Sequence, residues 1–211
     1  TAPSTLEIPN TFGHGTSTSV EIEQPVSTDL TISEKTTSDK ELPETLSVEM
    51  ETTASLIVDT PNLTVSLEGS YTTVEATTAE NTLIVAKNTV IETLTVKKGN
   101  VKIYGTVGEI VNEGTGKIIR CIDAQDEVER TLADTRCDHI LIEKPAGTLD
   151  FGGGTTTKQV CVEASVTIAN LIVSPEKEHP VMVSGDNVKL TLDGVKLVCN
   201  AAKTYAVNCL D

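Results

Sequence analysis

The chain has 211 residues, a formal net charge of −15 at pH 7, no tryptophan and an aromatic content of only 2%. This negative charge disfavours nucleic acid and anionic lipid surfaces as partners, because both carry phosphate groups that a negative protein repels. No apolar run approaches the roughly 20 residues that a membrane helix needs, so the sequence predicts no insertion into a membrane.

Residues 1–59 form an acidic segment with a loose repeat of short apolar alternations. Eleven acidic residues stand here against Lys35 and Lys40, which gives the segment a net charge of −9. A 26-residue shift superposes Val20, Ile22, Leu30 and Ile32 on Leu46, Val48, Leu56 and Val58. This alternation predicts half-buried strands. Residues 1–59 are therefore either early coils of a solenoid or a separate small β-sandwich.

Residues 60–121 carry a clearer repeat with a period of 19. Asn62, Asn81 and Asn100 open the runs NLTVSL, NTLIVA and NVKIYG. The spacing predicts two columns of equivalent positions, namely Val65, Ile84 and Ile103 in one and Leu63, Thr82 and Val101 in the other. A period of about 20 residues built from short strands is typical of stacked coils, so this segment is predicted to be a β-solenoid.

The segment CIDAQDEVERTLADTRCDH predicts the one helix of the chain, over about 124–135. Asp123 or Asp126 is the expected N-cap, and Val128 and Leu132 lie four residues apart on one face. We expect these two apolar residues to face the interior of the following coil. The charged residues around them are expected to stay in water, namely Asp126, Glu127, Glu129 and Arg130. Such a helix would cover an open coil end, whose backbone groups and apolar interior need a partner.

Residues 122–211 return to strands after the helix, with a period of 24. The shift superposes Val166, Ile168, Leu171 and Val173 on Leu190, Leu192, Val195 and Leu197, and Val181 and Val183 on Tyr205 and Val207. The last strand, in TYAVNCLD, is expected to leave a free edge. That edge would pair end to end with another copy of the chain or with further coils beyond Asp211.

Two stretches resemble known β-helical proteins. The helix phrase EVERTLADTRCDHILIEKPAGTLDF, followed by VTIANLIV and NVKLTLDGVKL, resembles the first coils of right-handed parallel β-helices of the pectin-lyase-like class, in which a short helix caps the first coil. The stretch NTLIVAKNTVIETLTVKKGNVKIYGTVGEI is similar to coils of bacterial surface proteins of the adhesin type. This resemblance spans roughly residues 60–211. It implies an all-β, right-handed parallel β-helix with one short internal capping helix, secreted or held at a bacterial cell surface.

Asp134, Arg136, Asp138 and His139 form the strongest polar cluster in the sequence. Two carboxylates beside basic groups are the type of set that acid–base cleavage of sugars needs. The same residue types commonly cap helices, form turns and make surface ion pairs. Sugar-cleaving members of the resembled class carry rows of acidic and basic residues on neighbouring rungs, and no such row is visible here. We therefore expect no catalytic residue, and these four would be catalytic only if the chain is an enzyme.

The remaining reactive residue types show no metal or cofactor pattern. Five cysteines without CxxC spacing do not predict a zinc site or a dense disulfide framework. His14 and His179 have no partner at ligand spacing. Tyr71 and Tyr104 are either exposed on strands or part of the rungs, and so few aromatic residues disfavour a large sugar-stacking cleft. We therefore expect no metal and no cofactor.

The function expected from these patterns is non-enzymatic. The chain is predicted to be a secreted or cell-surface module, bacterial by resemblance, that adheres through its side surface or spaces another domain. Its expected partner is an extracellular glycan or a protein on a host or cell surface. The alternative is a carbohydrate-active enzyme, either a polysaccharide lyase or a glycoside hydrolase.

Overall fold

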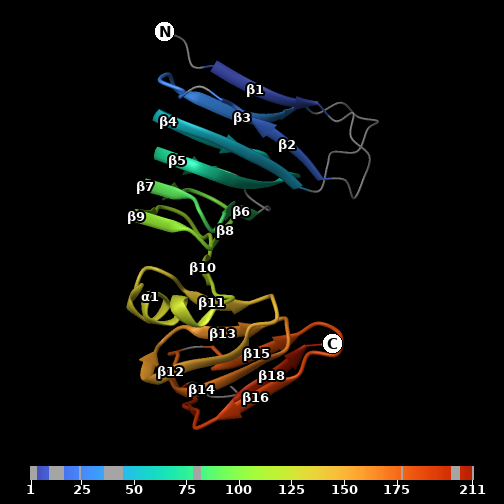
Figure 1. The fold of residues 1–211 in the computed structure, drawn as a ribbon, viewed down its shortest axis with the longest axis vertical. Helices are drawn as coiled ribbons and strands as arrows, with labels where there is room; N and C mark the ends of the chain where they lie inside the picture. The colour runs from blue at the N-terminus through green and yellow to red at the C-terminus, as the bar shows by residue number, and fades with distance from the viewer. Residues whose placement is uncertain are drawn as a thin grey trace. The chain divides into compact units, whose positions relative to one another are not determined.

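The computed structural model describes residues 4–9, 17–23, 25–35, 45–77, 82–176, 178–200 and 205–210. Within these residues the chain is an all-β protein whose strands pair in parallel, with one short helix (Figure 1). The predicted parallel β-solenoid with a single short helix is therefore confirmed. Contacts divide the chain into two compact units, residues 1–117 (unit 1) and residues 118–211 (unit 2). The finer division at residues 59 and 121 stays a prediction, and His14, Asn81 and Asp211 lie outside the described residues.

Unit 1 stacks its strands in two parallel columns. Its described strands are β1 (Ser4–Pro9), β2 (Ser17–Glu21), β3 (Leu30–Lys35), β4 (Thr45–Asp59), β5 (Thr64–Ala76), β6 (Thr82–Val85), β7 (Val90–Val96), β8 (Asn100–Ile103) and β9 (Thr106–Asn112). The long strands β4 and β5 run through both columns. The first column is β2, β4, β5, β6 and β8, and the second is β1, β3, β4, β5, β7 and β9. Strands β1 to β3 therefore stack on β4 in the same parallel manner as the later coils.

The 26-residue repeat is confirmed in the second column of unit 1 and wrong in the first. Leu30 pairs with Leu56, as predicted. Val20, however, pairs with Val48, so the offset there is 28. Val20 and Leu30 are ten residues apart, against eight for Val48 and Leu56, so the two columns cannot share one offset. The two offsets, 28 and 26, differ by two residues. Side chains along a strand alternate with period two, so the same residues still face inward.

The predicted 19-residue register is wrong by one residue at β6. Val65 pairs with Leu83, and Leu83 pairs with Val101, so both offsets are 18. Leu83 is 4% exposed and lies in the core, whereas Ile84 is only partly buried. A slip of one residue exchanges the two faces of a strand. The run of three apolar residues from Leu83 to Val85 does not say by itself which face is inward.

Unit 2 has two parallel sheets that enclose an aliphatic core. Its described strands are β10 (Ile118–Cys121), β11 (His139–Ile142), β12 (Gly147–Thr156), β13 (Gln159–Val162), β14 (Val166–Val173), β15 (Val181–Ser184), β16 (Leu190–Asp193), β17 (Lys196–Leu197) and β18 (Val207–Leu210). One sheet has the order β10, β11, β13, β15, β18. In the other, β14 lies between β12 and the short strands β16 and β17. The buried residues of both sheets form one core cluster.

The 24-residue repeat of unit 2 is confirmed in one sheet and wrong in the other. Val166 pairs with Leu190 and Val173 pairs with Leu197, as predicted. Val181, however, pairs with Val207 instead of Tyr205, an offset of 26. The connection that leads into β18 is two residues longer than the one that leads into β15. Turn length, which the apolar pattern does not encode, therefore sets the register.

The helix covers the edge of the second sheet of unit 2. A 3-10 turn over Gln125–Glu127 continues as α1 over Val128–Ala133, within the predicted range, and it packs against β12 (Figure 1). The side-chain amide of Gln125 donates to the carbonyl oxygen of Asp150 at 2.7 Å. It also accepts from the backbone N–H of Asp150 at 2.7 Å. One side chain thus makes both hydrogen bonds that a neighbouring strand would otherwise make.

The predicted apolar face of the helix is confirmed, but two details of its start are wrong. Val128 is 5% exposed and belongs to the core of unit 2, with Leu132 packed against it. Neither predicted aspartate is an N-cap, since the 3-10 turn follows Ala124 and no side chain caps it. Glu127, expected in water, is 4% exposed, and its Oε2 accepts the backbone N–H of Asp123 at 3.0 Å. The tight 3-10 turn brings this residue inward.

Replacing Leu83 or Ile84 by lysine tests the observed register. Leu83→Lys places an ammonium group in the core and should lower the free energy of unfolding by about 3 kcal/mol or more. Ile84→Lys, on the outer face, should cost less than about 1 kcal/mol. Urea denaturation of the two variants measures this difference. Equal losses of unfolding free energy, or a larger loss for Ile84→Lys, would contradict the observed register and support the 19-residue register.

Replacing Gly69 by alanine tests whether β5 approaches β4 as closely as the structure shows. Its φ of 108° is unfavourable for other residues, and a Cβ atom would overlap the carbonyl oxygen of Met50. We expect Gly69→Ala to lower the unfolding free energy by about 3 kcal/mol, combining backbone strain with overpacking. The control is Gly153→Ala, where φ is 83° and no atom lies within 4 Å of the new Cβ, so only strain of about 1 kcal/mol is expected. Thermal denaturation that gives both variants the same loss would contradict the close approach.

Candidate functional site

Asp134 and Arg136 are brought together at the end of the helix. The Arg136 side chain donates from Nε to Oδ1 of Asp134 at 2.9 Å and from Nη2 to Oδ2 at 3.2 Å. The backbone N–H of Arg136 also donates to Oδ1, at 3.2 Å. Burial opposes ionisation of Asp134, but the hydrogen bonds and charge of Arg136 hold its pKa below the usual range. The carboxylate is therefore ionised, and its hydrogen bonds hold the turn that ends α1.

Asp138 and His139 make separate contacts at the start of β11. The backbone N–H of Asp138 donates to the carbonyl oxygen of Ile118 at 2.8 Å, and Oδ2 of Asp138 accepts the N–H of Ile118 at 2.9 Å. His139 is 5% exposed, and its Nε2 lies 3.1 Å from Oε2 of Glu178. The four predicted residues thus divide among three separate contacts. These contacts favour structural roles at a helix-to-strand turn, and the expectation that none of the four is catalytic stays a prediction.

Buried charges beneath the helix were not predicted from the sequence. Arg120 is 2% exposed, because it pairs with the core residue Ile140 and therefore occupies an inward position. Lys158 is 6% exposed, and its Nζ donates to the carbonyl oxygen of Thr131 in α1 at 3.0 Å. Burial lowers the pKa of both basic groups. The only sequence signal was the position of Arg120 inside the apolar run IIRCI.

Cys137 is a buried thiol in this same region. All five cysteines lie among the described residues, and none forms a disulfide. Burial, together with the negative charge of Asp134, raises the pKa of Cys137 to about 12. An unfolded thiol has a pKa of about 8.5. The folded state therefore retains a proton that the unfolded state releases at intermediate alkaline pH.

This difference predicts how stability depends on pH. The stability contribution of Cys137 is fully present below about pH 8.5 and is lost as pH rises toward 12, because only the unfolded state ionises in that window. Between pH 9 and 11 the unfolding free energy of the native chain should fall more steeply than that of Cys137→Ala, by up to about 1.4 kcal/mol per pH unit. Cys199→Ala, which removes an exposed thiol, is the control and should keep the native slope. Chemical denaturation at each pH measures the slopes, and identical slopes for Cys137→Ala and the native chain would contradict the assignment.

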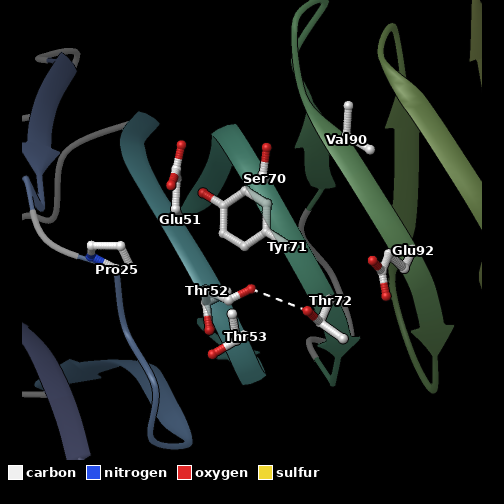
Figure 2. A pocket seen from close by; sticks show the side chains of 9 residues that line it. All are labelled: Pro25, Glu51, Thr52, Thr53, Ser70, Tyr71, Thr72, Val90 and Glu92. Atoms are coloured by element: carbon white, nitrogen blue, oxygen red, sulfur yellow. Dashed lines mark hydrogen bonds between the residues drawn. The ribbon is translucent and has the colours of Figure 1, made fainter.

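A hollow of about 420 Å³ lies on the outside of unit 1, where the two columns meet (Figure 2). We call it the corner groove. It is lined mainly by outward side chains of β4, β5 and β7, namely Glu51, Thr53, Ser70, Thr72, Val90 and Glu92. Pro25 stands at its edge next to β4, where the N–H of Val26 donates to the carbonyl oxygen of Glu51 at 2.8 Å.

The corner groove consists of two outward rows that cross the strands. Glu51 pairs with Ser70, which pairs with Val90, and these three form the first row. The second row lies two residues further along each strand and consists of Thr53, Thr72 and Glu92. The residues between the rows point inward and are at most 6% exposed, namely Thr52, Tyr71 and Ile91. The groove is therefore an outer surface with a closed floor.

A β-bulge explains why the surface is hollow at this place. The pairing of β4 with β5 shifts register between Thr52 and Ser55. Thr52 turns the chain locally, since its Oγ1 donates to the carbonyl oxygen of Ala54 at 3.1 Å and accepts the N–H of Ala54 at 3.0 Å. Oγ1 of Thr72 donates to the carbonyl oxygen of Thr52 at 3.2 Å, which ties the bulge to β5 (Figure 2). Bulges bend a strand and redirect its side chains.

The charge of the corner groove is negative. Glu51 and Glu92 are exposed, and none of the described residues in the lining is basic. Val90 adds an apolar patch with 47% of its surface exposed. The lining therefore suits a neutral or positively charged ligand. Sequence reasoning missed these residues, although Glu51, Ser70 and Val90 recur at close to the 19-residue period and identify an outward row once the inward face is known.

Both tyrosines considered from the sequence are buried. Tyr71 is 2% exposed and Tyr104 is 7% exposed. The Tyr71 hydroxyl lies 3.1 Å from the carbonyl oxygen of Val48 and 2.8 Å from that of Glu68, and burial raises its pKa. The ring therefore belongs to the floor of the corner groove and offers no open face for stacking.

Comparisons with known proteins identify no relative. No protein-family model, curated protein or solved structure matches the chain. The pectin-lyase-like, bacterial and adhesin assignments therefore depend on the sequence resemblance alone. Among the described residues, no helix has the length and apolar character to span a membrane. Over the same residues, no three His, Cys, Asp or Glu side chains converge as metal ligands do.

Proposed function

We propose that this chain is a non-enzymatic, secreted or cell-surface β-solenoid module that binds an extracellular glycan or a surface protein through the corner groove. The observation that carries the proposal is the groove itself, in which outward side chains of three neighbouring strands line one hollow. The sequence resemblance to pectin-lyase-like β-helices and to bacterial adhesin-type surface proteins supports an extracellular location. End-to-end association of copies stays a separate prediction.

The polysaccharide lyase or glycoside hydrolase is the less favoured candidate. Glycoside hydrolysis needs two carboxyl groups on either side of the scissile bond, one of them acting as an acid. Asp134 is held ionised by Arg136, and Asp138 is hydrogen-bonded to the backbone of Ile118. Neither arrangement prepares a proton donor for a sugar. The contacts of these residues therefore give the enzymatic candidate no support at this cluster.

Blocking the corner groove tests the binding function. Ser70 is exposed at its centre, so Ser70→Trp should fill the hollow and reduce binding at least tenfold. Thr191→Trp, at an exposed position of β16 in unit 2, is the matched control and should bind as the native chain does. Labelled protein is titrated onto host cells and onto immobilised matrix glycans and proteins. Saturable binding that Ser70→Trp leaves unchanged would contradict the groove as the binding site.

The enzymatic candidate has its own test. Acidic and neutral polysaccharides are incubated with the native chain and assayed for new reducing ends and for unsaturated uronates. We expect no product. Turnover that disappears in Asp138→Asn or His139→Ala would overturn the binding function and favour the enzyme.

A further inference from the structure

We infer that the corner groove takes an extended basic peptide segment, with two lysine or arginine side chains placed against Glu51 and Glu92. The inference rests on the proposed function, since it names the ligand class of the same groove. It assigns the ligand to a protein rather than a glycan. Three observations carry it, namely the charge of the lining, the spacing of the two carboxylates and the burial of Tyr71.

The charge of the lining selects a cation. Glu51 and Glu92 lie at opposite corners of the groove, on β4 and β7, with β5 between them (Figure 2). Both carboxylates are exposed, and among the described residues that line the groove there is no basic side chain to compete with a ligand. The formal net charge of −15 adds a long-range attraction for positive ligands. An anionic polysaccharide would be repelled by the same field.

The spacing of the carboxylates fits a peptide in the extended conformation. Adjacent strands are about 4.8 Å apart, and residues rise about 3.3 Å each along a strand. Glu51 and Glu92 differ by two strands and by two residues along the strand, which places their backbones about 12 Å apart. In an extended peptide, residues i and i+4 lie on one face about 13 Å apart. Basic residues at these positions therefore reach both carboxylates, with residue i+2 between them.

The middle of the groove suits the central part of such a peptide. Val90 offers an apolar contact with 47% of its surface exposed, and it lies next to Ser70 in the same row. The exposed hydroxyls of Thr53 and Ser70 can hydrogen-bond the peptide backbone. Residue i+2 would lie over β5, between Ser70 and Thr72, and a small apolar side chain there can turn toward Val90 on the neighbouring strand. The preferred segment is thus basic, then any residue, then small apolar, then any residue, then basic.

The floor of the groove disfavours a sugar. Sugar rings often stack on aromatic faces, and Tyr71 is the only aromatic residue among the described residues that line the groove. Its ring is 2% exposed, and its hydroxyl contacts two backbone carbonyl oxygens. It offers a glycan neither a stacking face nor a hydroxyl that reaches the surface. A peptide needs neither.

A short synthetic peptide tests the inference on the full chain. The probe is acetylated and amidated, carries a fluorophore, and has two lysines four residues apart with threonine, valine and threonine between them. Fluorescence anisotropy should show saturable binding that weakens as salt rises from 50 to 500 mM. A peptide with norleucine in place of both lysines should bind at least tenfold more weakly. A peptide with the lysines two residues apart should bind with about threefold lower affinity.

Matched charge variants locate the site. Glu51→Gln and Glu92→Gln should each lower the affinity for the lysine peptide about threefold. The double variant should lower it about tenfold. Glu109→Gln removes an exposed carboxylate of β9 outside the groove and should leave the affinity unchanged. Circular dichroism and melting temperature check that each variant is folded. Equal binding of the norleucine peptide, or full binding by the folded double variant, would overturn the inference.

The two proposals fail in different ways. Glycan or cell binding that Ser70→Trp abolishes but the Glu51→Gln and Glu92→Gln double variant retains would overturn the basic peptide while leaving the binding function standing. Binding that neither Ser70→Trp nor the double variant changes would overturn both.

Discussion

Backbone hydrogen bonding between successive coils is the constraint on which the rest of this structure depends. Each parallel strand satisfies its N–H and C=O groups on the strands before and after it, so an uncovered strand edge needs another partner. At β12 that partner is the side-chain amide of Gln125, with both bonds to Asp150 at 2.7 Å. The helix lies where it does because this edge must be covered, and Val128 then closes the core beneath it.

The charged residues around the helix follow from the same constraint. A helix that covers a coil end brings its own terminal carbonyl groups into a buried region, where they need donors. Lys158 supplies one by donating to Thr131, and the pair of Asp134 and Arg136 ends the helix. Burying a cation is costly unless it is partnered, and burial lowers the pKa of Lys158 for this reason. A set of residues that resembles an acid–base centre in sequence therefore makes hydrogen bonds that end the helix and join neighbouring strands.

Alternation along the strands separates the core of unit 1 from the corner groove. Tyr71 points inward and closes the floor, whereas its neighbours Ser70 and Thr72 point outward and line the corner groove. Stacking aligns such outward residues from successive coils into rows across the strands. The bulge in β4 then turns part of this flat surface into a hollow. Core and groove therefore arise from the same short strands, and a register slip of one residue would exchange them.

The sequence by itself determined the elements and the larger period of this protein. Apolar alternation predicted the strands, the segment over about 124–135 predicted the helix, and the 24-residue repeat predicted the pairing of Val166 with Leu190. Only the tertiary structure decided that Leu83 faces the core in place of Ile84, because turn lengths fix the register and three consecutive apolar residues leave both faces possible. It also decided the contact of His139 with Glu178 and the meeting of Glu51, Ser70 and Val90 in one groove. These residues come from different coils, and a repeat with an uncertainty of one or two residues cannot say which side chains meet across neighbouring coils.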